Sequence, residues 1–249
     1  MQHVPYQASD LLTHSSIVHG FFGRVGGVSD GDFASLNINL HNGDDEQNVV
    51  ENRARIAHAM GIELIVTLRQ VHKNDVLVVD EKTENGHQMD AMVTKIPGRL
   101  LAIQTADCTP ILLADHVSGV IGAVHAGWRS AVAGIVEKTV QAMESLGAKK
   151  EHIAAVVGPT IHQANYEVGQ EVFDAANAPE FFASSIRPSH YFFDLPGYVL
   201  SHLKLSGINT TEALPYDTYA LEDQYFSYRR SCHRQDSSWG GQLSVIGLR

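Results

Sequence analysis

Two histidines and one cysteine stand in settings where side chains often carry out chemistry. His72 lies in LRQVHKND, Cys108 in TADCTP and His125 in AVHAGWR, each at the border of an apolar run that is typical of a buried strand. Reactive groups of α/β-type proteins gather where strands end at one rim of a sheet. Two imidazoles and a thiolate match the three-ligand set of catalytic zinc, which leaves one position open, and they also suit copper.

The same three residues fit other interpretations. Their separations along the chain match no compact zinc-finger pattern, and a buried cysteine is often only a small apolar residue. Without a metal ion, Cys108 could act as a nucleophile with His125 or His72 as its base. The local sequence does not separate a metal site from such a Cys–His dyad.

The apolar pattern predicts the elements that must position these residues. A helix that begins after Asp45 and ends before Gly61 is predicted from its capping residues and apolar spacing. A second helix is predicted over 129–146 from one apolar face. Strands are predicted for 66–72, 76–80, the two halves of 99–115 around a polar turn, 119–128, 153–161 and QLSVIGL at 242–248. This irregular order favours an α+β fold of mixed β-sheets with flanking helices, in one domain over residues 1–249.

The composition limits what the protein binds. The 249 residues carry a formal net charge of -10, which argues against a nucleic-acid or anionic-membrane surface but allows a small anion in a local basic pocket. No stretch reaches the length of a membrane span. The N-terminal segment lacks the pattern of a signal peptide, and there are only two cysteines, so we expect a cytoplasmic protein with reduced thiols.

Several motifs together resemble one known family. They are RQVH (69–72), DAMVT (90–94), TADCTPILLAD (105–115), GAVHAGWRS (122–130), VGPTI with YEVG (157–169) and YFSYRR (225–230). This set is similar to the YfiH-type family, whose members are called laccase-domain proteins or multicopper polyphenol oxidoreductases, and also purine nucleoside phosphorylases. The resemblance spans nearly the whole chain, and TADC and HAGWR at this spacing are specific when they occur together.

The resemblance implies an activity, a cofactor and a fold. The activity is phosphorolysis of adenosine, inosine, guanosine and methylthioadenosine, with adenosine deamination as a second reaction. The cofactor is zinc or copper on the residues that match RQVH, TADC and HAGWR, which here are His72, Cys108 and His125, and these would also be catalytic. The implied fold is α+β and similar to the cysteine-hydrolase domain of cytotoxic necrotizing toxins.

Other residues are candidates for binding substrate. Arg129 at the predicted helix start and Arg24 beside a Gly–Gly turn could each bind phosphate together with backbone amides. Asp107 could be the carboxylate that moves protons during deamination, or it could cap the turn at Thr109 and Pro110. By resemblance, Asn37 and His41 could line the purine pocket.

The end of the chain departs from the family pattern. Gly241 stands where that pattern has an arginine before the final strand. If the arginine binds an anion in the family, Arg229 or Arg230 must serve here instead.

Three rival functions use the same residues. A multicopper laccase needs many histidines, often in H-x-H pairs, and no two histidines here stand two positions apart, so only a slow single-copper phenol oxidation would remain. A cysteine hydrolase would cleave amide bonds, for example in cell-wall precursors, through Cys108 without a metal. A binding protein would have kept the fold and no catalysis.

Overall fold

Two β-sheets packed face to face form the centre of the protein. The computed structural model describes residues 4–249. The five-stranded sheet has, in spatial order, β1 (Tyr6–Gln7), β2 (Ile17–Phe22), β14 (Gln242–Leu248), β6 (Arg99–Thr105) and β3 (Leu64–Thr67). The six-stranded sheet has β13 (Thr210–Ala213), β9 (Ala154–Val157), β7 (Thr109–Asp115), β8 (Val120–Ala126), β5 (Ala91–Thr94) and β4 (Val76–Val78). A small third sheet consists of β10 (Glu167–Gly169), β12 (His190–Phe193) and β11 (Phe182–Ser184).

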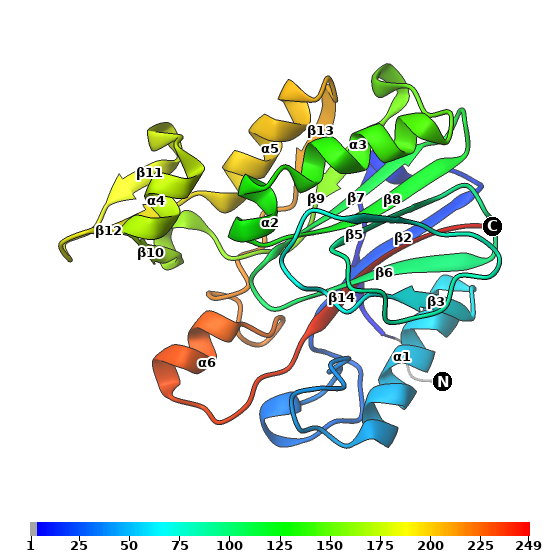
Figure 1. The fold of residues 1–249 in the computed structure, drawn as a ribbon. Coiled ribbons are helices and arrows are strands. Elements are labelled where there is room, and N and C mark those ends of the chain that lie inside the picture. The colour runs from blue at the N-terminus through cyan, green and yellow to red at the C-terminus, as the bar shows by residue number, and fades with distance from the viewer. Residues whose placement is uncertain (1–3) are drawn as a thin grey trace.

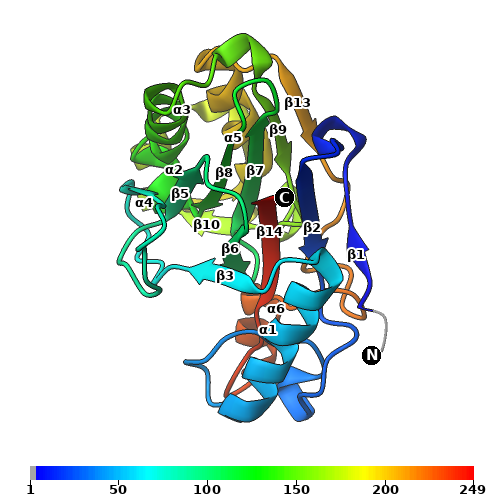
Figure 2. The same ribbon diagram turned by 90° about the vertical axis from the view of Figure 1, so that its right-hand side faces the viewer.

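Helices cover the outer faces of both large sheets. Figure 1 shows α3 (Ile135–Ser145) and α5 (Leu195–Leu205) on one side of the strands and α1 (Glu46–Met60) on the other. Shorter helices are α2 (Trp128–Val132), α4 (Gln170–Ala176) and α6 (Tyr228–Arg234). Figure 2 shows β14 between β2 and β6, so the last strand of the sequence lies inside its sheet. No helix in the described part of the chain is both long and apolar enough to cross a membrane.

The alternation of side chains along each strand explains the layers. In β6, Leu101 and Ile103 point into the core between the sheets, whereas Leu100 and Ala102 pack with the residues around α1. Successive side chains of a strand point to opposite faces, so a strand that is buried on both faces reads as a continuous apolar run. The two halves of 99–115 are such runs, and the structure therefore confirms the prediction of buried strands there.

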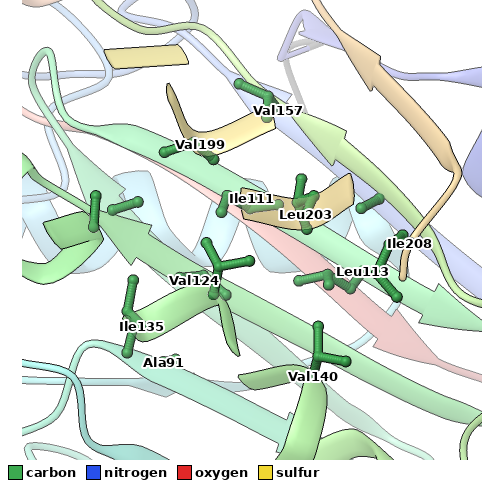
Figure 3. Packing of buried hydrophobic residues seen from close by; sticks show 14 of the residues in the cluster. Ala91, Ile111, Leu113, Val124, Ile135, Val140, Val157, Val199, Leu203 and Ile208 are labelled. Carbon is green, nitrogen blue, oxygen red and sulfur yellow. The ribbon is translucent and has the colours of Figure 1, made fainter. Parts of the chain in front are cut away.

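The outer core of the six-stranded sheet holds α3 and α5 in place. Val140 of α3 and Leu203 of α5 pack with Leu113 and Val124 of the sheet, and none of these side chains is more than 1% exposed (Figure 3). Complete burial of such a side chain contributes about 1.5–3 kcal/mol. This layer fixes β7 and β8, the two strands that border the candidate site.

The predicted elements agree with the structure except in three places, one of which is the strand predicted for 153–161, which ends at Val157. The first helix is confirmed, since the Asp45 side chain accepts a hydrogen bond from the Gln47 amide and Gly61 ends the helix with φ 70°. The predicted helix over 129–146 is instead two helices, because Gly134 adopts φ 83° between them. The predicted strand over 66–72 is wrong after Thr67, and His72 lies in a loop with φ 57°. The mixed sheets and flanking helices confirm the α+β prediction.

Candidate active site

His72, Cys108 and His125 meet at one end of the six-stranded sheet. Cys108 directly precedes β7, and His125 lies near the end of β8, opposite Pro110 in the antiparallel register. Strand pairing therefore brings these two side chains together. His72 comes from the loop between β3 and β4, and its ring centre lies 4.8 Å from that of His125. One donor atom from each of the three residues lies within 4.8 Å of the others.

The chemistry and spacing of this group fit a metal ion. Ligands of tetrahedral zinc, at their usual bond lengths, stand about 3.3–3.6 Å apart, so only small side-chain movements separate the present arrangement from coordination. Gly127 leaves the necessary room, because a Cβ there would lie 2.6 Å from His72 Nδ1 and 3.2 Å from Cys108 Sγ. The Nδ1 atom of His125 donates to Asp90 Oδ1 over 2.8 Å, which leaves Nε2 to face an ion.

The two histidines differ in their protonation. Burial lowers the pKa of His72 to about 4, with a further contribution from the charge of His125 nearby. Burial also disfavours charge on His125, but the Cys108 sulfur and Asp90 outweigh this effect and raise the pKa of His125 to about 9. The site therefore disfavours charge on His72 and favours it on His125, so coordination of an ion by a protonated His125 would release a proton.

Two arginines add positive charge beside the triad. Arg229 of α6 donates from Nη1 to the Glu167 carbonyl over 2.6 Å, and its guanidinium lies 5.4 Å from the ring centre of Tyr166. Its Nε and Nη2 make no hydrogen bond within residues 4–249, so they can bind a ligand. Tyr166 is near enough to the triad that burial and the charge of Cys108 raise its pKa. Arg129 is exposed, stacks on Trp128 and lies close enough to His72 to lower the pKa of that imidazole.

Comparison with known proteins shows the family to which the chain belongs. Residues 18–249 match the family described as multi-copper polyphenol oxidoreductase laccase. The chain belongs to this family. A Deinococcus radiodurans relative named purine nucleoside phosphorylase is 41% identical over 238 residues, which are 94% of this chain and 90% of the relative. The Escherichia coli relative, named purine nucleoside phosphorylase YfiH, is 35% identical over 231 residues, covering 90% and 91% of the two chains.

Solved structures support the same assignment to the laccase-domain family. YlmD from Geobacillus stearothermophilus has a TM-score of 0.88 at 28% identity and covers 99% of this chain and 100% of its own. The hypothetical protein YfiH from Bacillus licheniformis has the same TM-score and identity, with 94% and 93% covered. The similarity in fold extends over the whole laccase domain, including the segments that carry the triad.

Both carboxylate oxygens of Asp107, the residue before Cys108, accept hydrogen bonds from other residues of the chain. Oδ1 accepts from the Thr218 hydroxyl, and Oδ2 accepts from the Ser227 hydroxyl and the Arg229 amide. The residue is 7% exposed, and burial raises its pKa despite these bonds. The carboxylate therefore does not cap the turn at Thr109 and Pro110, and it instead ties the residue before Cys108 to the start of α6.

Asn37 and Arg24 are also held by protein partners. The Oδ1 atom of Asn37 accepts from the amides of Asn39 and Gly241, and its side chain is fully buried. Arg24 donates to the carbonyls of Ala34 and Glu222 and lies over a phenyl ring. These contacts give both residues a role in holding their loops.

His41 and Arg230 differ in exposure, and neither takes part in the triad. His41 is exposed on its loop. Arg230 donates to the backbone carbonyls of Thr218, Tyr219 and Tyr225. These bonds turn its guanidinium into the core. Of the two arginines that could replace the one missing at Gly241, Arg229 is therefore the better candidate.

The Arg129 prediction changes in one respect. It assumed a long helix whose first amides help to bind phosphate, but α2 has only five residues. Arg129 therefore offers its side chain alone.

Asp90, Gly127 and Tyr166 belong to the site although sequence patterns do not single them out. Each lies in a motif that carries the family resemblance, namely DAMVT, HAGWR and YEVG. The motifs mark these positions, but what each residue contacts is visible only in the folded chain.

Proposed function

We propose that this laccase-domain chain is a purine nucleoside phosphorylase with adenosine deamination as a second reaction. It would act on adenosine, inosine, guanosine and methylthioadenosine in the cytoplasm, with phosphate as co-substrate and with neither nucleic acid nor membrane as a partner. The observation that carries the proposal is the convergence of His72, Cys108 and His125. Tyr166 connects this group to a cation, because it lies near Cys108 and its ring centre is 5.4 Å from the Arg229 guanidinium. The curated relatives named purine nucleoside phosphorylase support the substrate class.

The triad would hold one zinc or copper ion, since a thiolate and two imidazoles suit both metals. When bound, the ion would supply Lewis-acid stabilisation of negative charge in the open part of the site. Within residues 4–249 no second group of three His, Cys, Asp or Glu donors is close enough to hold another ion. This supports a single-metal site and argues against the three-copper cluster of a laccase.

Arg229 is the residue best suited to bind phosphate. Phosphorolysis forms a bond from a phosphate oxygen to ribose C1′ while the bond from C1′ to the base nitrogen breaks, so the dianion must be held beside the sugar. Arginine binds phosphate through paired N–H donors, and Nε and Nη2 of Arg229 are such a pair. Arg129, whose charge lowers the pKa of His72, would add positive charge at the exposed rim of the site.

A specific observation also favours a second candidate, the metal-free amide hydrolase. Asp90, His125 and Cys108 follow one another as carboxylate, imidazole and thiol, with the imidazole in contact with both neighbours. This order is the one that activates a cysteine nucleophile. Sensitivity to a chelator separates the two candidates, because only the phosphorylase is proposed to need an ion.

The test uses purified protein loaded with zinc or copper and supplied with adenosine and phosphate. We expect adenine and ribose 1-phosphate, little product from Cys108→Ala, and loss of product after chelation that added metal restores. Adenosine that stays intact with both metals would refute the proposal. Amide hydrolysis that survives chelation would favour the hydrolase.

The phosphate site has its own test. Arg229→Met should raise KM for phosphate at least tenfold, because one charge-assisted contact contributes about 1.5–3 kcal/mol. Arg187→Met is the matched control: Arg187 also contacts Glu167, but through an exposed ion pair. If both variants change KM for phosphate equally, Arg229 does not bind it directly.

A further inference from the structure

One buried carboxylate contacts both histidines of the triad. Asp90 lies just before β5 and is completely buried. Its Oδ1 accepts from the ring Nδ1 of His125 over 2.8 Å and from the backbone amide of His72 over 3.0 Å. Its Oδ2 accepts from the amides of Val71 and Lys73 over 3.2 and 2.8 Å. Side-chain and backbone donors thus occupy both oxygens.

The backbone around His72 is shaped to receive this carboxylate. Three consecutive amides, those of residues 71–73, point at one side chain, which is the arrangement called a nest. A nest needs a residue in the left-handed region, and His72 has φ 57°. That conformation is unfavourable for a histidine and persists only where surrounding contacts impose it. The hydrogen bonds to Asp90 are such contacts.

We propose that Asp90 is the positioning residue of the metal site, which sets the ring orientation of His125 and the backbone conformation of His72 at the same time. This inference rests on the proposed metal site and adds to it a residue that is not itself a ligand. It follows that His125 binds the ion through Nε2, because Nδ1 is committed to Asp90. It also follows that the two imidazoles cannot be disturbed independently.

Asparagine cannot replace this carboxylate. All four groups that face Asp90 are donors, and asparagine has the same shape but only one acceptor oxygen. The side-chain NH₂ of asparagine would face N–H groups of the protein, and neither side could accept a hydrogen bond from the other. Asp90→Asn should therefore release either the loop of His72 or the ring of His125.

Asp115 provides a matched control. It is also completely buried, and it accepts from the backbone amides of Val117, Ser118 and Lys149. It lies at the opposite end of β7 from Cys108. Asp115→Asn should therefore cost folding stability through the same loss of acceptors without touching the triad.

The experiment measures Zn²⁺ affinity of the full chain by competition with a chromophoric chelator, and the absorption spectrum of the Co²⁺-loaded protein. We expect Asp90→Asn to lower Zn²⁺ affinity about 10–100-fold and to change the Co²⁺ ligand-field bands, and Asp115→Asn to leave both as in the wild type. Urea unfolding of the metal-free proteins shows whether both variants fold. If Asp90→Asn fails to fold, Asp90→Ser takes its place in the same assays, because its smaller side chain leaves room for water to reach the released donors.

The outcomes separate this inference from the proposed function. Unchanged affinity and spectrum in the Asp90 variant, or equal losses in the Asp115 control, would overturn the positioning role. A wild-type chain that binds neither Zn²⁺ nor Co²⁺ would overturn this role together with the metal site. Metal binding that depends on Asp90 in a protein without phosphorolysis would uphold the role and refute only the nucleoside reaction.

Discussion

Gly127→Ala tests the metal site with the smallest possible change. The backbone of Gly127 has φ -73° and ψ 167°, which alanine adopts without strain. The added Cβ, however, would lie 2.6 Å from His72 Nδ1 and 3.2 Å from Cys108 Sγ, whereas an ordinary contact is 3.4–4 Å. The imidazole must therefore retreat by about 1 Å, several times the ~0.2 Å tolerance of a metal–ligand distance.

This displacement sets the size of the expected effect. Displacing one ligand by that distance should cost about 10–100-fold in Zn²⁺ affinity, and a misplacement of about 1 Å should cost about 100-fold in kcat/KM for phosphorolysis. Folding should be affected little, because one side of His72 faces solvent and the imidazole can turn outward there. Competition titration with Zn²⁺ and steady-state kinetics measure the two losses, and thermal unfolding without metal measures the fold.

Gly169→Ala is the control for this variant. Gly169 also precedes a short helix, with φ -82° and ψ 174°, and a Cβ there would meet no atom within 4 Å. Both substitutions change the residue before a helix in the same way, so their effects on stability should match. Wild-type Zn²⁺ affinity in Gly127→Ala, or an equal loss in Gly169→Ala, would refute the reasoning.

Three further predictions concern stability. Arg230→Met should lower the free energy of unfolding by about 2–4 kcal/mol in urea titrations, because buried carbonyls lose their charged donor; a change under about 1 kcal/mol would contradict this. Leu203→Ala should cost about 2–5 kcal/mol in the same assay, since the side chain is fully buried against the six-stranded sheet. Burial lowers the pKa of His19, which accepts a hydrogen bond from the Ser9 amide, so the unfolded chain takes up protons more readily. Stability should therefore be complete above the unfolded pKa of about 6.5 and fall as the pH drops below it, and His19→Gln should show a smaller fall between about pH 7.5 and about pH 5.5. An unchanged pH dependence in that variant would show that His19 is not responsible.

Much of the fold follows from local patterns in the sequence. Continuous apolar runs predict β6, β7 and β8 because both faces of these strands are buried, and caps predict α1 to within a residue. The break at Gly134 could not be predicted, since a glycine within a helical pattern is often tolerated and only its left-handed φ divides the helix. The pattern also misplaces the end of β3, because Val71 continues the apolar run while the amides of that segment bond to Asp90.

The donors of the site can be predicted from the sequence, whereas their surroundings cannot. Strand ends indicate Cys108 and His125, whereas His72 lies in a loop and is indicated only by its family motif. Adjacent arginines cannot be told apart in this way, because Arg229 and Arg230 have the same chemistry and only the direction of each side chain decides which faces the site. The positions of Arg229 and Arg230 in the sequence do not reveal which way either side chain points.

The central position of β14 has a consequence for how the protein is made. β14 hydrogen-bonds with β2 on one side and β6 on the other, so both strands keep an unpaired edge on the ribosome until residues 242–248 have emerged. The preceding segment carries Ser227, whose hydroxyl closes the turn around Cys108 through Asp107. A nascent chain that ends before Ser227 therefore lacks both a continuous sheet and a finished cysteine turn, and the turn around Cys108 is completed before the strand that pairs the two open edges has emerged.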